Sequence, residues 1–195
     1  MRLGRTILPV LIVGTAFSAT ASRAADNLDC VSTGYTAEIA AEIDSFQGIF
    51  NAGNGWGPEL PQSVFGAVTG RAGQCAEQHG WSPEAIEDAV FFQMFSILRG
   101  GVARGTPLSS TQMQRVDQAL AGPDQERLRA IVGRQVDSVL GGAEAPEPTE
   151  AENMFIGRLI LRAGVPVTEE NGHYVGAYMA SVVMPQVIAA RFADR

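Results

Sequence analysis

The most continuous run of apolar residues lies in the middle of the chain and predicts a helix from Ser82 to Gly101. Ser82 is a favourable N-cap, because its hydroxyl can accept a hydrogen bond from an unpaired amide of the first turn. Pro83 follows at the first helical position, where its missing N–H has no cost. Between these ends nearly every face is apolar, and such a helix is expected to have neighbours on several sides. The sequence therefore predicts a central helix around which the other helices pack.

One narrow stripe of this helix is less apolar than the rest. Its members follow the spacing i, i+4, i+7 and i+11, which places them on one face. They are Ala89, Gln93, Ser96 and Gly100. We expect this stripe to be the solvent-exposed edge of the helix. The alternative is a seam where a second backbone comes close to these mostly small residues.

Helical periodicity and capping signals predict further helices on both sides of the central one. Their ranges are 36–51, 61–78, 109–120, 123–140, 149–164 and a last helix that begins after Thr168. Ser109 with Gln112, and Thr149 with Glu152, have the spacing of capping boxes. Pro185 lies too deep in the last helix to be a cap, so we expect a kink or break there. With no strand pattern in the sequence, the predicted fold is all-α: a single-domain, irregular bundle of about six or seven helices.

Three glycines fall within the predicted 61–78 helix. They are Gly66, Gly70 and Gly73. Each lowers helix stability by about 1 kcal/mol relative to alanine. Because they line a face without side chains, we expect another helix to approach closely there and to compensate for this loss.

Two segments have the composition of loops. Residues 51–61 are rich in glycine and contain Trp56. We expect Trp56 to pin this loop to the body of the protein; stacking on a ligand is the alternative, which makes it a candidate binding residue. Residues 141–148 are small, polar and proline-rich, and this composition predicts a mobile linker.

The N-terminal residues have the pattern of an export signal, which we expect to end at residue 24, with cleavage after Ala21 as the alternative. Arg2 and Arg5 form a positive segment, residues 7–17 are a short apolar run, and small residues follow. The run is shorter than the roughly 20 residues needed to span a bilayer. We therefore expect residues 25–195 to form the mature all-α domain, with no membrane span after the signal is removed.

The mature chain is strongly acidic. Residues 1–24 hold three of the 14 basic residues and none of the 21 acidic ones, so their removal changes the formal net charge from −7 to −10. Such a chain repels nucleic acids, and we expect no nucleic-acid partner. Every basic residue is an arginine, as is typical of GC-rich bacterial genomes. Together with the export signal, this predicts a periplasmic location.

The only two cysteines are Cys30 and Cys75. In an oxidising compartment, two cysteines in one exported domain most often pair, so we predict a disulfide. Closing a loop of this length stabilises the fold by about 4 kcal/mol in the chain-entropy model. Two free thiols are the alternative, since the spacing fits neither a redox motif nor haem attachment.

The densest cluster of polar and aromatic residues surrounds the start of the central helix. It contains His79, Trp81, Glu84 and Glu87. His79 with either glutamate would form a general acid–base pair, although interaction with the helix dipole explains both glutamates without catalysis. Trp81 is a second candidate binding residue. With two histidines and two paired cysteines we expect no metal site, and no motif predicts a cofactor.

These signals are architectural more than catalytic. The leading hypothesis is an exported periplasmic helical protein with a non-enzymatic binding or interaction role, whose partner is a protein or small ligand of the periplasm. The alternative is a small periplasmic hydrolase that uses His79 with Glu84 or Glu87. A crevice lined by His79, Trp81 and Glu84 would favour the enzyme, whereas an apolar groove elsewhere would favour binding.

Overall fold

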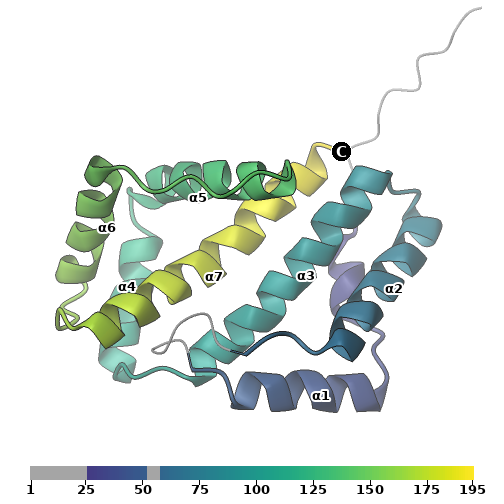
Figure 1. The fold of residues 1–195 in the computed structure, drawn as a ribbon, viewed down its shortest axis with the longest axis horizontal. Helices are drawn as coiled ribbons and strands as arrows, with labels where there is room; N and C mark the ends of the chain where they lie inside the picture. The colour runs from purple at the N-terminus through teal and green to yellow at the C-terminus, as the bar shows by residue number, and fades with distance from the viewer. Residues whose placement is uncertain (1–25, 52–57) are drawn as a thin grey trace, which may run out of the picture.

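The computed structural model describes residues 26–51 and 58–195. Within these residues all regular secondary structure is helical, which confirms the predicted all-α fold (Figure 1). A short 3₁₀ helix, η1 (Leu28–Ser32), precedes seven α-helices. Their bounds are α1 (Ala37–Gly48), α2 (Gln62–His79), α3 (Pro83–Arg104), α4 (Ser110–Leu120), α5 (Gln125–Leu140), α6 (Glu150–Arg162) and α7 (Glu169–Ala193). The predicted export signal and Trp56 lie outside the described residues.

Hydroxyl side chains at the predicted positions begin five of these helices. Each accepts a hydrogen bond from a backbone N–H in the first turn; they are Thr36, Ser82, Ser109, Thr149 and Thr168. Both predicted capping boxes are complete, with Gln112 and Glu152 bonding back to the N-cap amides. The bonds satisfy amides that would otherwise lack partners. Local chemistry therefore sets where these helices begin.

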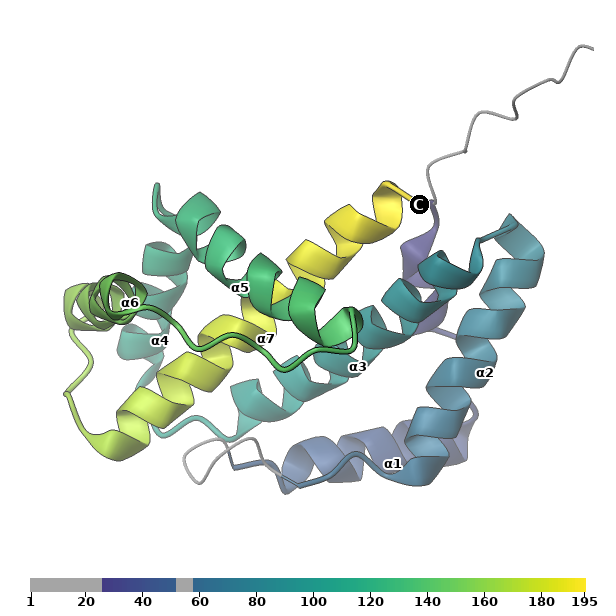
Figure 2. The ribbon, with the colours of Figure 1, turned by 45° about the horizontal axis from the view of Figure 1, so that its top comes forward.

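α3 and α7 form the centre of the bundle and run antiparallel (Figures 1 and 2). Asp88, near the start of α3, accepts hydrogen bonds from Arg191 near the end of α7 and from Arg195 just beyond it, at 3.2 and 2.9 Å. The Asp88 side chain is 1% exposed. Arg191 also pairs with Asp137 of α5. One buried carboxylate and its arginines thus join three helices.

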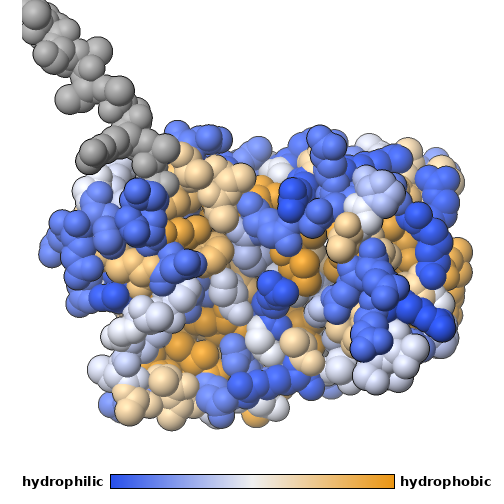
Figure 3. All heavy atoms as spheres, turned by 180° about the vertical axis from the view of Figure 1, so that it is seen from behind, coloured by the Kyte–Doolittle hydropathy of each residue, from blue (hydrophilic) through white to orange (hydrophobic). Residues whose placement is uncertain are grey.

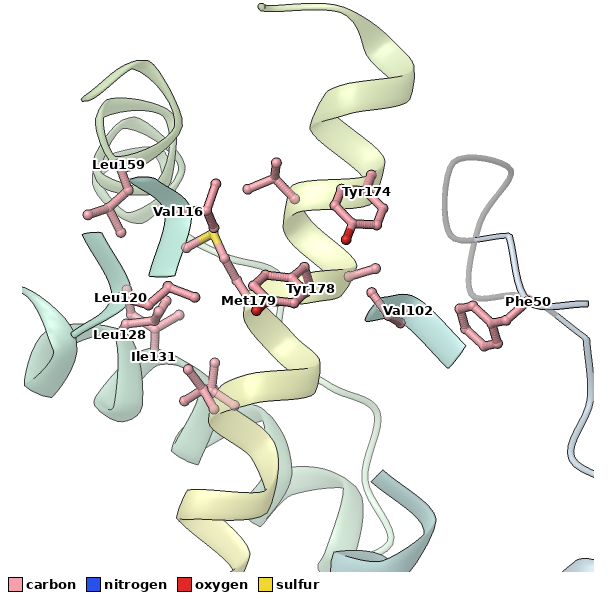
Figure 4. Packing of buried hydrophobic residues seen from close by; sticks show 14 of the residues in the cluster. Phe50, Val102, Val116, Leu120, Leu128, Ile131, Leu159, Tyr174, Tyr178 and Met179 are labelled. Atoms are coloured by element: carbon pink, nitrogen blue, oxygen red, sulfur yellow. The ribbon is translucent and has the colours of Figure 1, made fainter. Parts of the chain in front are cut away.

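The other helices pack around this pair in two groups. α5 crosses α7, and α4 and α6 lie beyond it at one end (Figure 2). α1 and α2 pack on the side of α3 that faces away from α7 (Figure 1). Side chains from α4, α5 and α6, including Val116, Leu128, Ile131 and Leu159, converge on Met179 of α7 (Figure 4).

A smaller core cluster lies where the described chain begins. Val31 of η1, Cys75 of α2, Trp81 and Phe192 of α7 are all buried in it. The disulfide between Cys30 and Cys75 is present, with 6.0 Å between the two Cα atoms, and it confirms the predicted pairing. It fastens η1 onto α2.

The prediction that the polar stripe of α3 is its solvent edge is wrong. Ala89 and Gln93 are buried, and Gln93 accepts a hydrogen bond from the Ser32 hydroxyl of η1 at 3.0 Å. A Cβ at Gly100 would lie 2.1 Å from the Gln47 side chain of α1. The stripe is the seam against which η1 and α1 pack, because only small or hydrogen-bonded residues allow them so close.

Of the kink or break expected at Pro185, the break is absent. α7 continues from Glu169 to Ala193 with Pro185 inside it and buried. A proline in a helix interior costs about 3 kcal/mol, because it removes a backbone hydrogen bond and its ring clashes with the preceding turn. The neighbouring Val183 and Ile188 are also buried, and each such side chain contributes about 1.5–3 kcal/mol. Packing against α3 and α5 therefore outweighs the local preference.

The close approach expected at the glycines of α2 is also absent. Among the described residues, no side chain or neighbouring backbone lies within 4 Å of a Cβ built at Gly66, Gly70 or Gly73. The buried face of α2 is formed instead by Val64, Val68, Ala72, Cys75 and Ala76. The glycines face outward because this apolar stripe, and the disulfide on it, determine which side of α2 meets the core.

Two further segments complete the fold. Residues 141–148 connect α5 to α6 without regular structure, and the Ser138 hydroxyl of α5 bonds to the Glu144 carbonyl at 2.8 Å. α7 has the length and composition of a membrane span, but 56% of its most apolar window is buried inside the bundle. That burial is the pattern of a core helix.

Candidate functional site

Within the described residues, the structure does not pair His79 with Glu84 or Glu87. His79 ends α2 and is exposed, and Glu84 and Glu87 lie exposed on the first turns of α3. Across the part of the chain that the structure describes, no hydrogen bond or ion pair joins His79 to either glutamate. The His79 ring instead stacks on Trp81, with 5.9 Å between ring centroids.

Trp81 is a core residue in this fold. Its side chain is 8% exposed and packs edge-on against Phe192, with ring centroids 4.9 Å apart. Its indole N–H donates to the carbonyl of Asp26 at 2.9 Å. Both the apolar body and the polar atom of Trp81 are thus occupied within the protein, which leaves little of the ring for a ligand.

The glutamates at the start of α3 belong to the helix cap and to the Arg195 environment. Backbone hydrogen bonding at the helix start, followed by the Ser82 hydroxyl, lowers the pKa of Glu84. The pKa of Arg195 is raised, first by its hydrogen bond to Asp88 and then by the charges of Asp88, Glu84 and Glu87. These carboxylates therefore lie near an arginine and a capped helix end. Both features favour the ionised carboxylate, whereas a general acid must carry a proton.

An apolar pocket lies between α3, α5 and α7. Its volume is about 250 Å³. Gln135 is the only one of its lining residues with a polar side chain; the others are Phe91, Phe95, Val136, Val139, Leu140, Ala145, Met184 and Ile188. Ala145 comes from the 141–148 segment, which therefore forms part of the wall. We call this the α3–α5–α7 pocket.

Several of the side chains that line this pocket are partly exposed to solvent. Phe91, Phe95 and Met184 pack against the core yet keep part of their surface exposed, and the Val139 side chain is 50% exposed. Helical spacing in the sequence puts Val139 and Leu140 on the apolar side of α5. It cannot show that α5 crosses α3 and α7 at an angle that leaves a hollow between them.

A second hollow lies on a different part of the surface. Its volume is about 440 Å³, and it is lined by Leu28, Phe92 and Phe192 together with the acidic residues Asp26 and Asp29. It is broad and open, and it borders the first residue that the structure describes. Seen from behind, the molecule shows separate apolar patches between many polar residues (Figure 3). The α3–α5–α7 pocket is the better candidate, because its walls are almost wholly apolar.

The described residues contain no group of three or more His, Cys, Asp and Glu side chains that could hold a metal ion. No protein-family model matches the chain, and no curated protein or solved structure matches it either. The case for a function consequently comes from the geometry of the described residues.

Proposed function

We propose that this chain is an exported periplasmic protein that binds an apolar ligand in the α3–α5–α7 pocket. The observation that carries the proposal is the pocket itself: about 250 Å³, with a single polar side chain in its lining. That volume exceeds the roughly 150 Å³ of an engineered apolar cavity that binds benzene. It lies just below the roughly 300–1,000 Å³ typical of small-molecule sites.

The physical driving force is the removal of apolar surface from water. Phe91, Phe95 and Met184 each keep exposed surface here, and covering it contributes about 25 cal/mol per Å². Water in this hollow finds few hydrogen-bond partners, because its lining is almost wholly apolar. Export to the periplasm is supported by the N-terminal sequence pattern and by a disulfide of the kind found in oxidising compartments.

The test compares two valine substitutions. Val139→Asp places a carboxylate in the pocket wall, whereas Val167→Asp makes the same change at a 78% exposed valine outside the pocket. Decanol or an uncharged apolar dye is titrated into each protein. Because the ligand would strip water from the new charge, we expect Val139→Asp to weaken binding at least about tenfold, and Val167→Asp to match the wild type.

Urea unfolding of each variant supplies the control. Both valines are substantially exposed, so the two variants should retain similar stability and helical content. Equal binding by all three proteins would place the ligand elsewhere, and an absence of binding to the wild type would contradict the proposal.

A further inference from the structure

We infer that the ligand of the α3–α5–α7 pocket is an amphiphile, a single aliphatic chain that ends in a carboxylate, and that Arg99 binds the carboxylate. The inference rests on the proposed function and names the chemical class of its ligand. The apolar walls define where the chain would lie. The position of Arg99 defines which end of the pocket would hold the head group.

Arg99 lies on the same face of α3 as the aromatic wall of the pocket. Phe91, Phe95 and Arg99 follow one another at intervals of four residues, so their side chains succeed each other along one side of the helix. Both phenylalanines line the pocket. The guanidinium of Arg99 is therefore expected one turn beyond Phe95, at the end of the pocket nearer the C-terminus of α3.

α7, which packs against α3, indicates the same location for Arg99. Because α7 runs antiparallel to α3, its turns before Met184 face the later turns of α3. Tyr178 lies there, and its hydroxyl donates a hydrogen bond to Asp117 of α4 at 2.6 Å. Burial, followed by this bond and the charge of Asp117, raises the pKa of Tyr178, and the nearby Arg99 charge acts in the opposite direction. Arg99 thus lies near enough to Tyr178 for its charge to act there, one helical turn beyond the pocket lining at Phe95.

The charge of Arg99 is available for a ligand. Arg99 is exposed, and it takes part in none of the hydrogen bonds or ion pairs among residues 26–51 and 58–195. By contrast, Arg104, Arg134 and Arg191 each have a carboxylate partner. A cation without a partner beside an apolar pocket is complementary to an apolar chain with an anionic end.

Asp117 limits how strong this attraction can be. Its carboxylate is occupied by the Tyr178 hydroxyl, but its negative charge remains close to the proposed position of the head group. Exposed ion pairs contribute little even without such a neighbour. We therefore expect only about a three- to fivefold preference for a carboxylate over an uncharged head group of the same chain length.

The experiment measures the affinity of decanoate, decanol and decyltrimethylammonium for the wild type, for Arg99→Gln and for Arg158→Gln. Arg158 is the matched control, since it is an exposed arginine of α6, away from the pocket, without an ion pair in the described structure. We expect the wild type and Arg158→Gln to prefer decanoate, and Arg99→Gln to bind decanoate and decanol equally. Asp117→Asn, which keeps an acceptor for Tyr178, should strengthen decanoate binding alone.

The outcomes separate this inference from the function on which it rests. If decanol binds but decanoate is not preferred, or if the preference survives in Arg99→Gln, the carboxylate inference is overturned and the apolar pocket stands. A preference for decyltrimethylammonium overturns it equally. If no compound with a decyl chain binds the wild type, both the inference and the proposed function fail.

Discussion

Tyr35 shows how a single residue links the start of the described chain to α3. Its hydroxyl donates to the Val31 carbonyl of η1 at 2.6 Å, and its ring packs against the core. Burial raises the pKa of Tyr35 from 10.0 to about 12, while the charge of Arg71 and a hydrogen bond with Gln93 oppose the rise. The folded state thus favours the neutral phenol, which can donate, over the phenolate, which cannot.

This shift predicts a loss of stability in alkali. Because the pKa of Tyr35 is higher in the folded state, its contribution to the free energy of unfolding is complete below pH 10. That contribution is lost as the pH rises through about 12. Allowing for its partial exposure, the loss is about 1 kcal/mol. Between these pH values, the free energy of unfolding measured in urea should decline less steeply for Tyr35→Phe than for the wild type. Some decline should remain, because burial also raises the pKa values of Tyr174 and Tyr178.

A free energy of unfolding that declined with pH equally steeply for the two proteins would contradict the role given to Tyr35. So would a spectroscopic titration in which the Tyr35 phenol ionises with the ordinary pKa of an exposed tyrosine.

At the scale of the element, α2 and α3 use glycine in opposite ways. Gly70 of α2 faces open space, whereas a Cβ at Gly101 of α3 would lie 2.8 Å from the Phe50 ring. Both positions are inside helices, so both carry the same backbone cost. Only at Gly101 does close packing of another segment account for the glycine.

We predict that Gly70→Ala stabilises the protein by about 1 kcal/mol, because alanine has the higher helix propensity and meets no neighbour. Gly101→Ala should destabilise it, because the Phe50 side chain must shift to admit the methyl group. Thermal and urea unfolding of the two variants provide the measurement. Destabilisation by Gly70→Ala would show that another surface packs against this face of α2.

The contrast between these helices also shows what the sequence can predict. Caps such as Ser82 and Thr149 act within one turn, so the helix starts follow from local chemistry. Packing partners depend on which faces meet in three dimensions, and the roles of Gly70, Gln93 and Pro185 could not be read from spacing alone. The helix inventory was therefore predictable, whereas the neighbours of each helix were not.

The candidate site likewise depends on packing that the sequence alone could not predict. The sequence drew attention to His79, Trp81 and Glu84 because they are chemically distinctive and close together in the chain. The structure uses Trp81 in the core and Glu84 at a helix cap. The pocket is built from common apolar residues such as Phe91, Val136 and Ile188, which come from three helices far apart in sequence. Their individual identities carry no sign of a hollow.

At the scale of the whole molecule, a disulfide and a buried ion-pair cluster stabilise the bundle that contains the α3–α5–α7 pocket. The Cys30–Cys75 disulfide fastens η1 to α2, and the buried Asp88 holds the end of α7 through Arg191 and Arg195. Both lie outside the pocket wall. Together they stabilise a helical frame in which α3, α5 and α7 line the apolar pocket.

The most direct test is a methyl NMR titration of the wild-type protein with decanol. We predict that shifts concentrate on methyl groups of the pocket wall, at Val136, Val139, Leu140, Met184 and Ile188. Val167, an exposed valine outside the pocket, should be unaffected. Shifts centred on Leu28 and Ala189 of the second hollow, or no shifts at saturating decanol, would contradict it.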